Sequence, residues 1–317
     1  MPFTGPDDFP LLMISAMYEN GGNTVHRLLD GHPELFVYPF ESQIGTRLVH
    51  DEWTSLFPQK YRYPVFALDA TDRENFFAII DEELRVRART PFVSKFREHP
   101  LALDDDERCE RFVELVRGHP RRSSTNVAAF FAATFDVWKD HLTSGEERIW
   151  VGYSPIFGID TEKFLGSLPQ AHLVHVVRNP WSAFAETLRR PVPLTLRHYV
   201  HGWTVVQQVV LAAQERFPDR VTIVRFEDVC VDSRAALQTV CERIGIAPDR
   251  LVATPTWNGQ KLVEVFPWGT IRVASTEANR DTASRLSDAQ RDEVTRRARS
   301  VLPRLAYATP EGEPLPV

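Results

Sequence analysis

One stretch near the N-terminus, residues 11–41, constrains the fold more than any other part of the chain. It opens with a largely apolar run, Leu11–Met17, which follows Pro10 and precedes polar residues. A short apolar run of this kind predicts a buried strand. Gly21 and Gly22 come next, and apolar side chains then recur at helical spacing. The stretch therefore predicts a strand, a glycine turn and a helix, in that order.

The helix of this unit carries signals at both ends. Asn23 or Thr24 is expected at the N-cap, because these side chains accept hydrogen bonds from the first-turn N–H groups. Gly31 stands where a left-handed C-cap is expected, and Pro33 prevents the helix from resuming.

A strand, glycine turn and helix N-terminus together present backbone N–H groups and the positive end of a helix dipole to an anion. We therefore predict a phosphate- or sulfate-binding loop. The motif GxxxxGK[ST] is absent, so the loop is not a Walker A sequence. The alternative is a tight glycine turn that binds nothing.

Composition and cysteine usage exclude several other classes of protein. The 317 residues are 43% apolar and 25% charged, which is typical of a soluble globular protein. A formal net charge of −6 argues against a general nucleic-acid binder. Cys109, Cys230 and Cys241 form no CxxC pair, which favours a reducing compartment and no structural zinc. The N-terminus is polar, and no apolar run reaches about 18 residues, so we expect a cytoplasmic protein without a membrane span.

Further strand–loop–helix units follow later in the chain. Apolar strands are predicted at residues 149–153, 171–177 and 221–225. Helices are predicted at residues 105–116, 125–141, 160–168, 181–188, 196–216, 235–244 and 287–301. Ser123, Ser124 and Thr125 are the N-cap candidates of the helix at 125–141, and its aromatic side chains are interpreted as core.

Alternating strands and helices predict an α/β fold with a three-layer, P-loop-like parallel sheet between helices. Residues 71–142 read as helices and form an insert over the substrate side of this sheet. We expect residues 1–317 to make one domain, with residues 11–65 and 149–310 as its α/β core.

Polar residues follow the predicted strands, at the edge where parallel sheets bind ligands. Arg178 directly follows an apolar strand, where its planar guanidinium suits a doubly charged phosphate, and a structural salt bridge is the alternative. Glu227 and Asp228 are interpreted as a hydrogen-bonding turn. The ten histidines show no metal spacing, and His172 and His175 lie on opposite faces of a strand.

In this order, four segments resemble the sulfotransferases that use 3′-phosphoadenosine 5′-phosphosulfate (PAPS). They are GGNTVHRLLDGHPEL…PFE, GYSP, HLVHVVRNPWSAFAET and VRFEDV. The resemblance covers about residues 11–45 and 150–310, and it points to the bacterial or tyrosylprotein-like branch. It implies a PAPS-dependent enzyme that moves a sulfuryl group to an acceptor hydroxyl of a carbohydrate or small natural product. It also implies that no metal or redox cofactor is required.

The resemblance assigns roles to individual residues. Glu41 falls at the position of the general base, and a carboxylate can take the proton that an acceptor hydroxyl must lose. Arg178 would bind the 3′-phosphate. The other implied donor-binding residues are Asn20, Gly21, Gly22, Asn23, Thr24, Glu186, Trp203, Trp268 and Ser275.

Two cations that the family usually carries are missing. Residues 18–20, Tyr-Glu-Asn, stand where a lysine or arginine normally precedes the glycine turn, and residues 153–155, Tyr-Ser-Pro, replace Lys-Thr-Pro. Candidates to replace these cations are His26, Arg27, Lys95 and Arg97. For His26 and Arg27, which are candidate catalytic residues, the alternative is a solvated helix face.

Two other functions remain open. One is a P-loop small-molecule kinase, although neither a glycine-loop lysine nor a Mg²⁺-binding aspartate is evident. The other is a catalytically degenerate nucleotide-binding protein of the same fold, for which the missing cations are the best argument. The sequence does not identify the acceptor.

Overall fold

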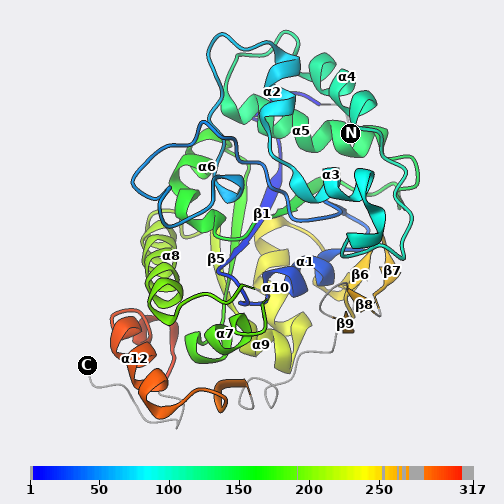
Figure 1. Cartoon of the computed structure of the whole chain (residues 1–317). Helices are drawn as coiled ribbons and strands as arrows, with labels where there is room; N and C mark the ends of the chain where they lie inside the picture. Colours follow the sequence, from blue (N-terminus) through cyan, green and yellow to red (C-terminus); the bar gives the residue numbers. More distant parts are fainter. Residues whose placement is uncertain are drawn as a thin grey trace.

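The computed structural model describes residues 3–190, 192–251, 254–262, 264–265, 269–270 and 282–308. A five-stranded parallel sheet with the order β2-β3-β1-β4-β5 forms its centre (Figure 1), which confirms the predicted α/β class. The strands are β1 (Leu11–Ala16), β2 (Leu35–Val37), β3 (Ile149–Tyr153), β4 (His172–Val177) and β5 (Val221–Arg225).

β1 is the central strand, and all six of its residues are buried. Because side chains alternate along a strand, Leu11 and Met13 belong to one hydrophobic core, whereas Leu12, Ile14 and Ala16 belong to the core on the other face. A strand covered on both faces needs a nearly continuous apolar run. The apolar start of the 11–41 stretch is therefore explained by its central place in the sheet.

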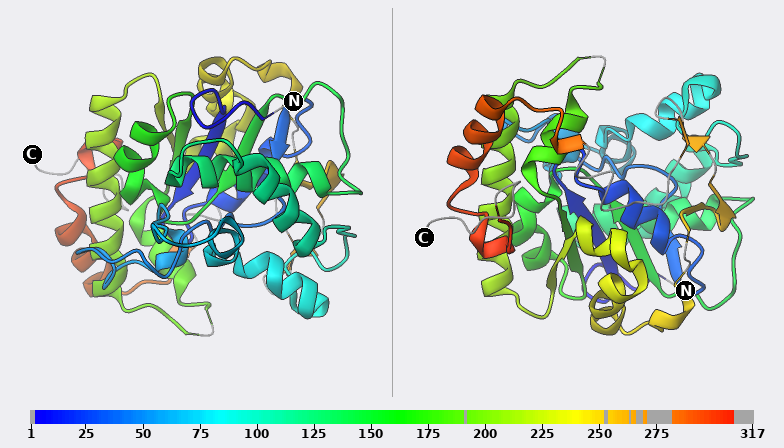
Figure 2. Two further views of the ribbon diagram at one scale, coloured as in Figure 1. Left: turned by 90° about the horizontal axis from the view of Figure 1, so that it is seen from above. Right: turned by 90° about the horizontal axis from the view of Figure 1, so that it is seen from below.

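Helices cover both faces of the sheet (Figure 2), which gives the predicted three layers. One face packs against α1 (Gly22–Leu29), α9 (Phe226–Val231) and α10 (Ser233–Ile244). The other packs against α5 (Ser123–Val137), α6 (Thr161–Ser167), α7 (Pro180–Thr187) and α8 (Leu196–Arg216). α12 (Asp288–Ala298) contacts α7 and α8 from outside.

The predicted insert, residues 71–142, contains helices separated by loops, after a mostly irregular segment that follows β2. It contains α2 (Asp72–Ala78), α3 (Glu82–Arg89), α4 (Asp105–Val116) and α5, and α2, α4 and α5 gather at one end of the molecule in Figure 1. Phe130 and Phe131 of α5 are fully buried, which confirms that the aromatic side chains of this helix are core. Phe131 packs against Gly152 of β3, so α5 lies directly on the sheet.

Short elements complete the chain. β6 (Thr256–Trp257) pairs antiparallel with β7 (Gln260–Lys261), and β8 (Glu264–Val265) pairs with β9 (Gly269–Thr270). The 3₁₀ turns are Gln59–Tyr61, Pro91–Val93, Phe157–Asp160, Pro248–Arg250 and Pro303–Leu305. Within the described ranges, no helix combines the length and the apolar character needed to cross a bilayer.

The start of α1 differs from the prediction. Its N-cap is Gly21, not Asn23 or Thr24, and no side chain caps it. Gly21 has φ 88°, a left-handed conformation that turns the chain early, so the helix already begins at Gly22. Asn23 and Thr24 therefore lie in the first turn, where both are partly exposed.

Three other elements differ from the prediction. α5 has Arg122 as its N-cap, so none of the predicted serine and threonine caps is used. The three-residue strand β2 is too short to show an alternating pattern in the sequence. α9 begins at Phe226, directly after β5, where the sequence suggested only a turn.

Gly21 should tolerate no side chain. A Cβ at this residue would overlap the Phe226 ring, whereas Gly118, which has a similar φ of 84°, has open space around it. Gly118→Ala should lower the free energy of unfolding by about 1 kcal/mol, because alanine is strained in the left-handed backbone conformation. Gly21→Ala should lower the free energy of unfolding by about 1–3 kcal/mol more than Gly118→Ala does, because the Phe226 ring must move. Equilibrium urea unfolding of both variants measures the difference, and equal costs would contradict the packing described here.

Candidate active site

The carboxyl ends of the five parallel strands form one edge of the sheet, and the candidate site lies there. From β1 the chain passes to β2 and β3 on one side, and then to β4 and β5 on the other side. Open α/β sheets bind ligands at such a switch point. The loop between β1 and α1, residues 17–21, therefore lies where a ligand is expected.

This loop leaves backbone donors available. Among the described residues, no acceptor is bonded to the N–H groups of Gly22, Asn23 and Thr24, and the first bond of α1 runs from the Val25 N–H to the Gly21 carbonyl oxygen at 3.1 Å. Unpaired N–H groups and the positive end of the helix dipole favour an anion. The site can therefore bind a phosphate or sulfate group through the backbone.

The Asn20 side chain connects this loop to the rest of the protein. Its Oδ1 accepts hydrogen bonds from the backbone N–H of Arg178 (2.9 Å) and from Trp203 Nε1 (3.1 Å). Its Nδ2 donates to the Tyr18 carbonyl oxygen (2.8 Å) and to the Tyr199 hydroxyl (3.0 Å). Asn20 and Trp203 are fully buried, so both support the loop, and their side chains are directed at protein groups.

Arg178 directly follows β4, as predicted, and it lies beside the loop. Its Nη1 donates to the Glu19 carbonyl oxygen at 3.1 Å, and its guanidinium carbon lies 5.4 Å from the centre of the Phe226 ring. The residue is 8% exposed. These contacts hold a planar cation at the end of a central strand, against the loop that leads into α1.

Two acidic side chains border the same loop. Glu19 has φ 60°, and its carboxylate lies 3.7 Å from Arg190 Nη1. Burial raises the pKa of Glu19, and the positive charge of Arg190 opposes this shift only in part. Glu186, a predicted donor-binding residue, accepts a hydrogen bond from the Thr282 hydroxyl at 3.2 Å. The loop thus carries a carboxylate at the place where a cation was expected.

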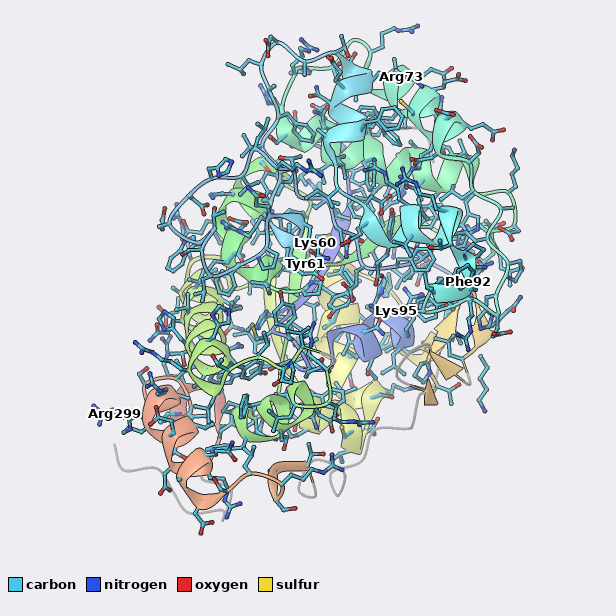
Figure 3. The ribbon with its side chains drawn as sticks, viewed as in Figure 1. Lys60, Tyr61, Arg73, Phe92, Lys95 and Arg299 are labelled. Atoms are coloured by element: carbon cyan, nitrogen blue, oxygen red, sulfur yellow. The ribbon has the colours of Figure 1, made fainter. Side chains whose placement is uncertain are left out.

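Glu41 lies four residues after β2, at the same edge. Its Oε1 accepts a hydrogen bond from Lys95 Nζ at 2.6 Å, and its Oε2 accepts one from the Tyr61 hydroxyl at 3.3 Å. Burial would raise the pKa of Glu41, but the Lys95 charge and these hydrogen bonds outweigh it and hold the pKa below its usual value. Glu41 is therefore an ionised acceptor. Tyr61 and Lys95, from separate segments, both lie near the centre of Figure 3.

Lys95 joins Glu41 to a second carboxylate, Glu83. Lys95 Nζ lies 2.7 Å from Glu83 Oε1, and Glu83 Oε2 accepts the backbone N–H of Glu41 at 3.1 Å. Burial and the Glu41 charge raise the pKa of Glu83. Burial lowers the pKa of Lys95, but the two carboxylates more than reverse this and raise it above its usual value. Sequence reasoning missed Glu83, because a glutamate in the first turn of a helix is typical of any helix N-terminus.

His26 and Arg27 are both fully buried, so the solvated alternative is wrong. The His26 ring centre lies 5.6 Å from that of Tyr153. Burial, together with the charges of Arg27 and Lys95, lowers the pKa of His26 well below its usual value, so the imidazole is neutral. Arg27 donates to the Tyr38 carbonyl oxygen at 2.8 Å, and burial lowers its pKa to about 10. Both side chains lie inside the protein, behind the site.

An aromatic cluster supports Glu41 and Lys95. The rings of their sequence neighbours, Phe40 and Phe96, stack with centres 5.8 Å apart and planes 19° apart. Trp257 lies 5.9 Å from Phe96 and 6.2 Å from Phe40. Because adjacent residues of both segments are packed together, the carboxylate and the ammonium are held in contact.

The remaining predicted residues have other places. Glu227 accepts hydrogen bonds from Asn179 N–H at 2.9 Å and from the Tyr307 hydroxyl at 2.9 Å, so its role is structural as predicted, although it lies in the first turn of α9 and not in an isolated turn. Trp268 and Ser275 lie outside the described residues. In the ranges that the structure describes, no group of three or more His, Cys, Asp or Glu side chains is arranged to hold a metal ion.

Several solved structures are similar to this chain. The sulfotransferase domain from the Synechococcus PCC 7002 olefin synthase is similar, with a TM-score of 0.52 and 18% identity, over 97% of this chain and 99% of that one. The sulfotransferase domain from the curacin biosynthetic pathway has a TM-score of 0.49 and 14% identity, and the match covers 95% of this chain and 98% of that domain. A sulfotransferase from Alicyclobacillus acidocaldarius has a TM-score of 0.46 and 15% identity, and the match covers 93% of this chain and 94% of that protein.

The sequence comparisons differ in what they find. A search of curated protein sequences found no match. A model of the sulfotransferase family matches residues 10–250, which is most of the chain. The chain therefore belongs to the sulfotransferase family.

Proposed function

We propose that this protein transfers the sulfuryl group of PAPS to an acceptor hydroxyl, with Glu41 as the general base. The observation that supports this best is the arrangement at one edge of the sheet. Free N–H groups of Gly22, Asn23 and Thr24, the Arg178 guanidinium and the Glu41 carboxylate all lie at the carboxyl ends of the strands. Membership of the sulfotransferase family supports the same reaction class.

The donor would bind along the strand ends. Its 5′-phosphosulfate would accept hydrogen bonds from the N–H groups of Gly22, Asn23 and Thr24, and its 3′-phosphate would pair with Arg178. Gly22 lets the start of α1 pack closely on the sheet, because a Cβ there would lie 2.5 Å from the Tyr153 ring and push the helix away. A kinase is the weaker alternative, since the loop carries no lysine for a nucleoside triphosphate.

Transfer would consist of one displacement at sulfur. The acceptor oxygen bonds to sulfur while the bond from sulfur to the bridging phosphate oxygen breaks, and the hydroxyl proton moves to Glu41. The electron pair leaves with 3′-phosphoadenosine 5′-phosphate. Positioning and electrostatic stabilisation should supply most of the rate, as in phosphoryl transfer.

Among the candidates to replace the missing cations, Lys95 lies at the proposed base. Its ammonium contacts Glu41 at 2.6 Å, and its charge is one of several that oppose in part the raised pKa of Glu19 in the loop. A carboxylate held ionised by this ammonium argues against the degenerate alternative, for which the missing cations were the best argument. The acceptor, a hydroxyl of a carbohydrate or small natural product, would approach Glu41 between the 43–65 segment, which provides Tyr61, and the helical insert.

Arg178→Met should weaken binding of the desulfated donor, 3′-phosphoadenosine 5′-phosphate. Hydrogen bonds to a charged group contribute about 1.5–3 kcal/mol, so affinity should fall roughly 10- to 100-fold. Isothermal titration calorimetry measures this change. Arg216→Met, which removes an exposed arginine at the end of α8, is the matched control and should bind as the wild type does. Absence of binding to the wild-type protein at millimolar nucleotide would exclude the donor.

Glu41→Gln should abolish transfer and leave nucleotide binding intact. The amide cannot take the acceptor proton, so kcat should fall about 10²- to 10⁴-fold. Turnover and calorimetry on the same preparation separate the two effects. Glu242→Gln, an exposed change on α10, controls for the loss of one negative charge. A Glu41→Gln enzyme with wild-type kcat would remove Glu41 as the base.

The pH profile should report the ion pair of Glu41. Glu41 accepts a proton only when ionised, so kcat/KM should rise with pH through the pKa of Glu41. Because Lys95 helps to hold this pKa below its usual value, the acid limb should lie below that of an ordinary glutamate, about pH 4.3. Lys95→Met removes the favourable charge and leaves the burial, so the limb should move to higher pH. An unchanged limb would show that Lys95 does not act on the base.

A further inference from the structure

The Glu41–Lys95–Glu83 cluster holds one more carboxylate than a base and its cation require. Lys95 Nζ lies 2.6 Å from Glu41 Oε1 and 2.7 Å from Glu83 Oε1, so one ammonium is shared by two carboxylates. The side chains of Glu41 and Glu83 are only 12% and 19% exposed. With both ionised, the three groups carry a net charge of −1. The cluster can therefore take up one proton and still keep Lys95 paired with an anion.

This surplus charge matters at the moment of proton transfer. When Glu41 accepts the acceptor proton it becomes neutral, and Lys95 loses the attraction of that carboxylate. A poorly hydrated charge that loses its partner is costly. Glu83 keeps a negative charge on the ammonium at that moment. Before the transfer, the same charge repels that of Glu41 and makes Glu41 a better proton acceptor.

Glu83 also fixes the backbone of the base. Its second oxygen accepts the N–H of Glu41 at 3.1 Å, while the first contacts Lys95. The carboxylate therefore reaches both the main chain of Glu41 and the cation of the pair. Glu83 lies in the first turn of α3, where the helix dipole favours an anion.

We propose that Glu83 is a positioning residue for sulfuryl transfer, whose carboxylate holds Lys95 and the Glu41 backbone and balances the ammonium when Glu41 takes the proton. This inference rests on the proposed function of Glu41. Glu83 itself touches neither donor nor acceptor in this scheme. Its effect should therefore be seen in the ionisation of Glu41 and in kcat, and not in donor affinity.

Several other groups share this environment, and a pH experiment has to allow for them. The titratable groups whose charges act on Glu41 or Glu83, or respond to them, are Lys60 and Tyr61 of the 43–65 segment, Tyr18 of the β1–α1 loop, Arg27 of α1 and Tyr153 of β3. Burial is the largest cause of the raised pKa values of the three tyrosines. Burial also lowers the pKa of Arg27 to about 10. The three tyrosines and Arg27 therefore do not titrate in the acid range in which Glu41 and Glu83 change charge.

The test compares Glu83→Gln with Glu82→Gln in the full-length protein. Glu82 is the neighbouring carboxylate in the same helix turn, but it is 53% exposed and pairs with Lys60. Both variants lose one charge near the N-terminus of α3, and only one of them changes the cluster. The readouts are calorimetry with 3′-phosphoadenosine 5′-phosphate, the pH dependence of kcat, and ¹³C NMR titration of labelled glutamate side chains, with the Glu41 signal assigned by its loss in Glu41→Gln.

As the pH falls, Glu83 should take a proton before Glu41 does, because the pKa of Glu83 is raised and that of Glu41 is lowered. The wild-type Glu41 signal should therefore respond in two steps, the upper one at the pH where Glu83 loses its charge. Glu83→Gln should remove this upper step and, with it, the upper part of the acid limb of kcat. It should also lower kcat about tenfold, part of the roughly 10²- to 10⁴-fold that a general base supplies. Nucleotide affinity should stay within about twofold of the wild type. Glu83→Asp keeps the charge, so it should leave the Glu41 titration closer to that of the wild type than Glu83→Gln does.

Two results would overturn the proposal. One is a pH titration of the Glu41 NMR signal that is the same in Glu83→Gln as in Glu82→Gln. The other is a kcat that falls with no movement of the acid limb, which would indicate structural damage alone. The NMR titration needs neither donor nor acceptor, so it still tests the influence of Glu83 on Glu41 if the wild-type protein shows no sulfuryl transfer. In that case the proposed function fails and the charge coupling is judged separately.

Discussion

The buried carboxamide of Asn20 is the interaction on which the candidate site depends. Three of its four hydrogen bonds join the β1–α1 loop to the first residue after β4 and to two aromatic side chains of α8, and the fourth goes to the Tyr18 carbonyl oxygen within the loop. A buried polar group that loses a partner costs about 1–3 kcal/mol, so this junction strongly favours one loop conformation. That conformation places the left-handed Gly21 under the Phe226 ring and leaves the N–H groups of α1 uncovered. The anion site is thus formed by backbone atoms that one side chain holds in place.

The positive charge of the site comes from a different part of the chain. Glu19 occupies the loop position where a cation was expected, and Lys95, which lies 54 residues beyond Glu41, supplies an ammonium near the same edge. An ammonium held by two carboxylates is less free to attract an anion than a lone lysine is. Donor binding should therefore depend mainly on the α1 backbone and on Arg178, whereas Lys95 acts mainly on the ionisation of Glu41.

The sequence predicted those parts of the structure that local patterns determine. The runs that form β3, β5 and α8 are apolar or amphipathic over enough residues to show their period, and their bounds match the prediction. Arg178 was predictable because it follows such a run directly. Glu83 was not, since its contact with Glu41 joins segments 42 residues apart and leaves no local pattern. The burial of His26 and Arg27 was hidden for the same reason: the groups that cover them come from other segments.

The donor side and the acceptor side of the site are therefore determined differently. The groups proposed to bind the donor lie in βα connections of the central strands, whose positions follow from the sheet itself. The groups around Glu41 come from the 43–65 segment, from α3 and from the chain that follows α3, which are not part of the sheet. Such segments can change without disturbing the strands. Acceptor choice in this chain should accordingly be encoded between residues 41 and 97, where the proposed base, the ammonium paired with it and the second carboxylate all lie, and not in the glycine loop that first indicated an anion site.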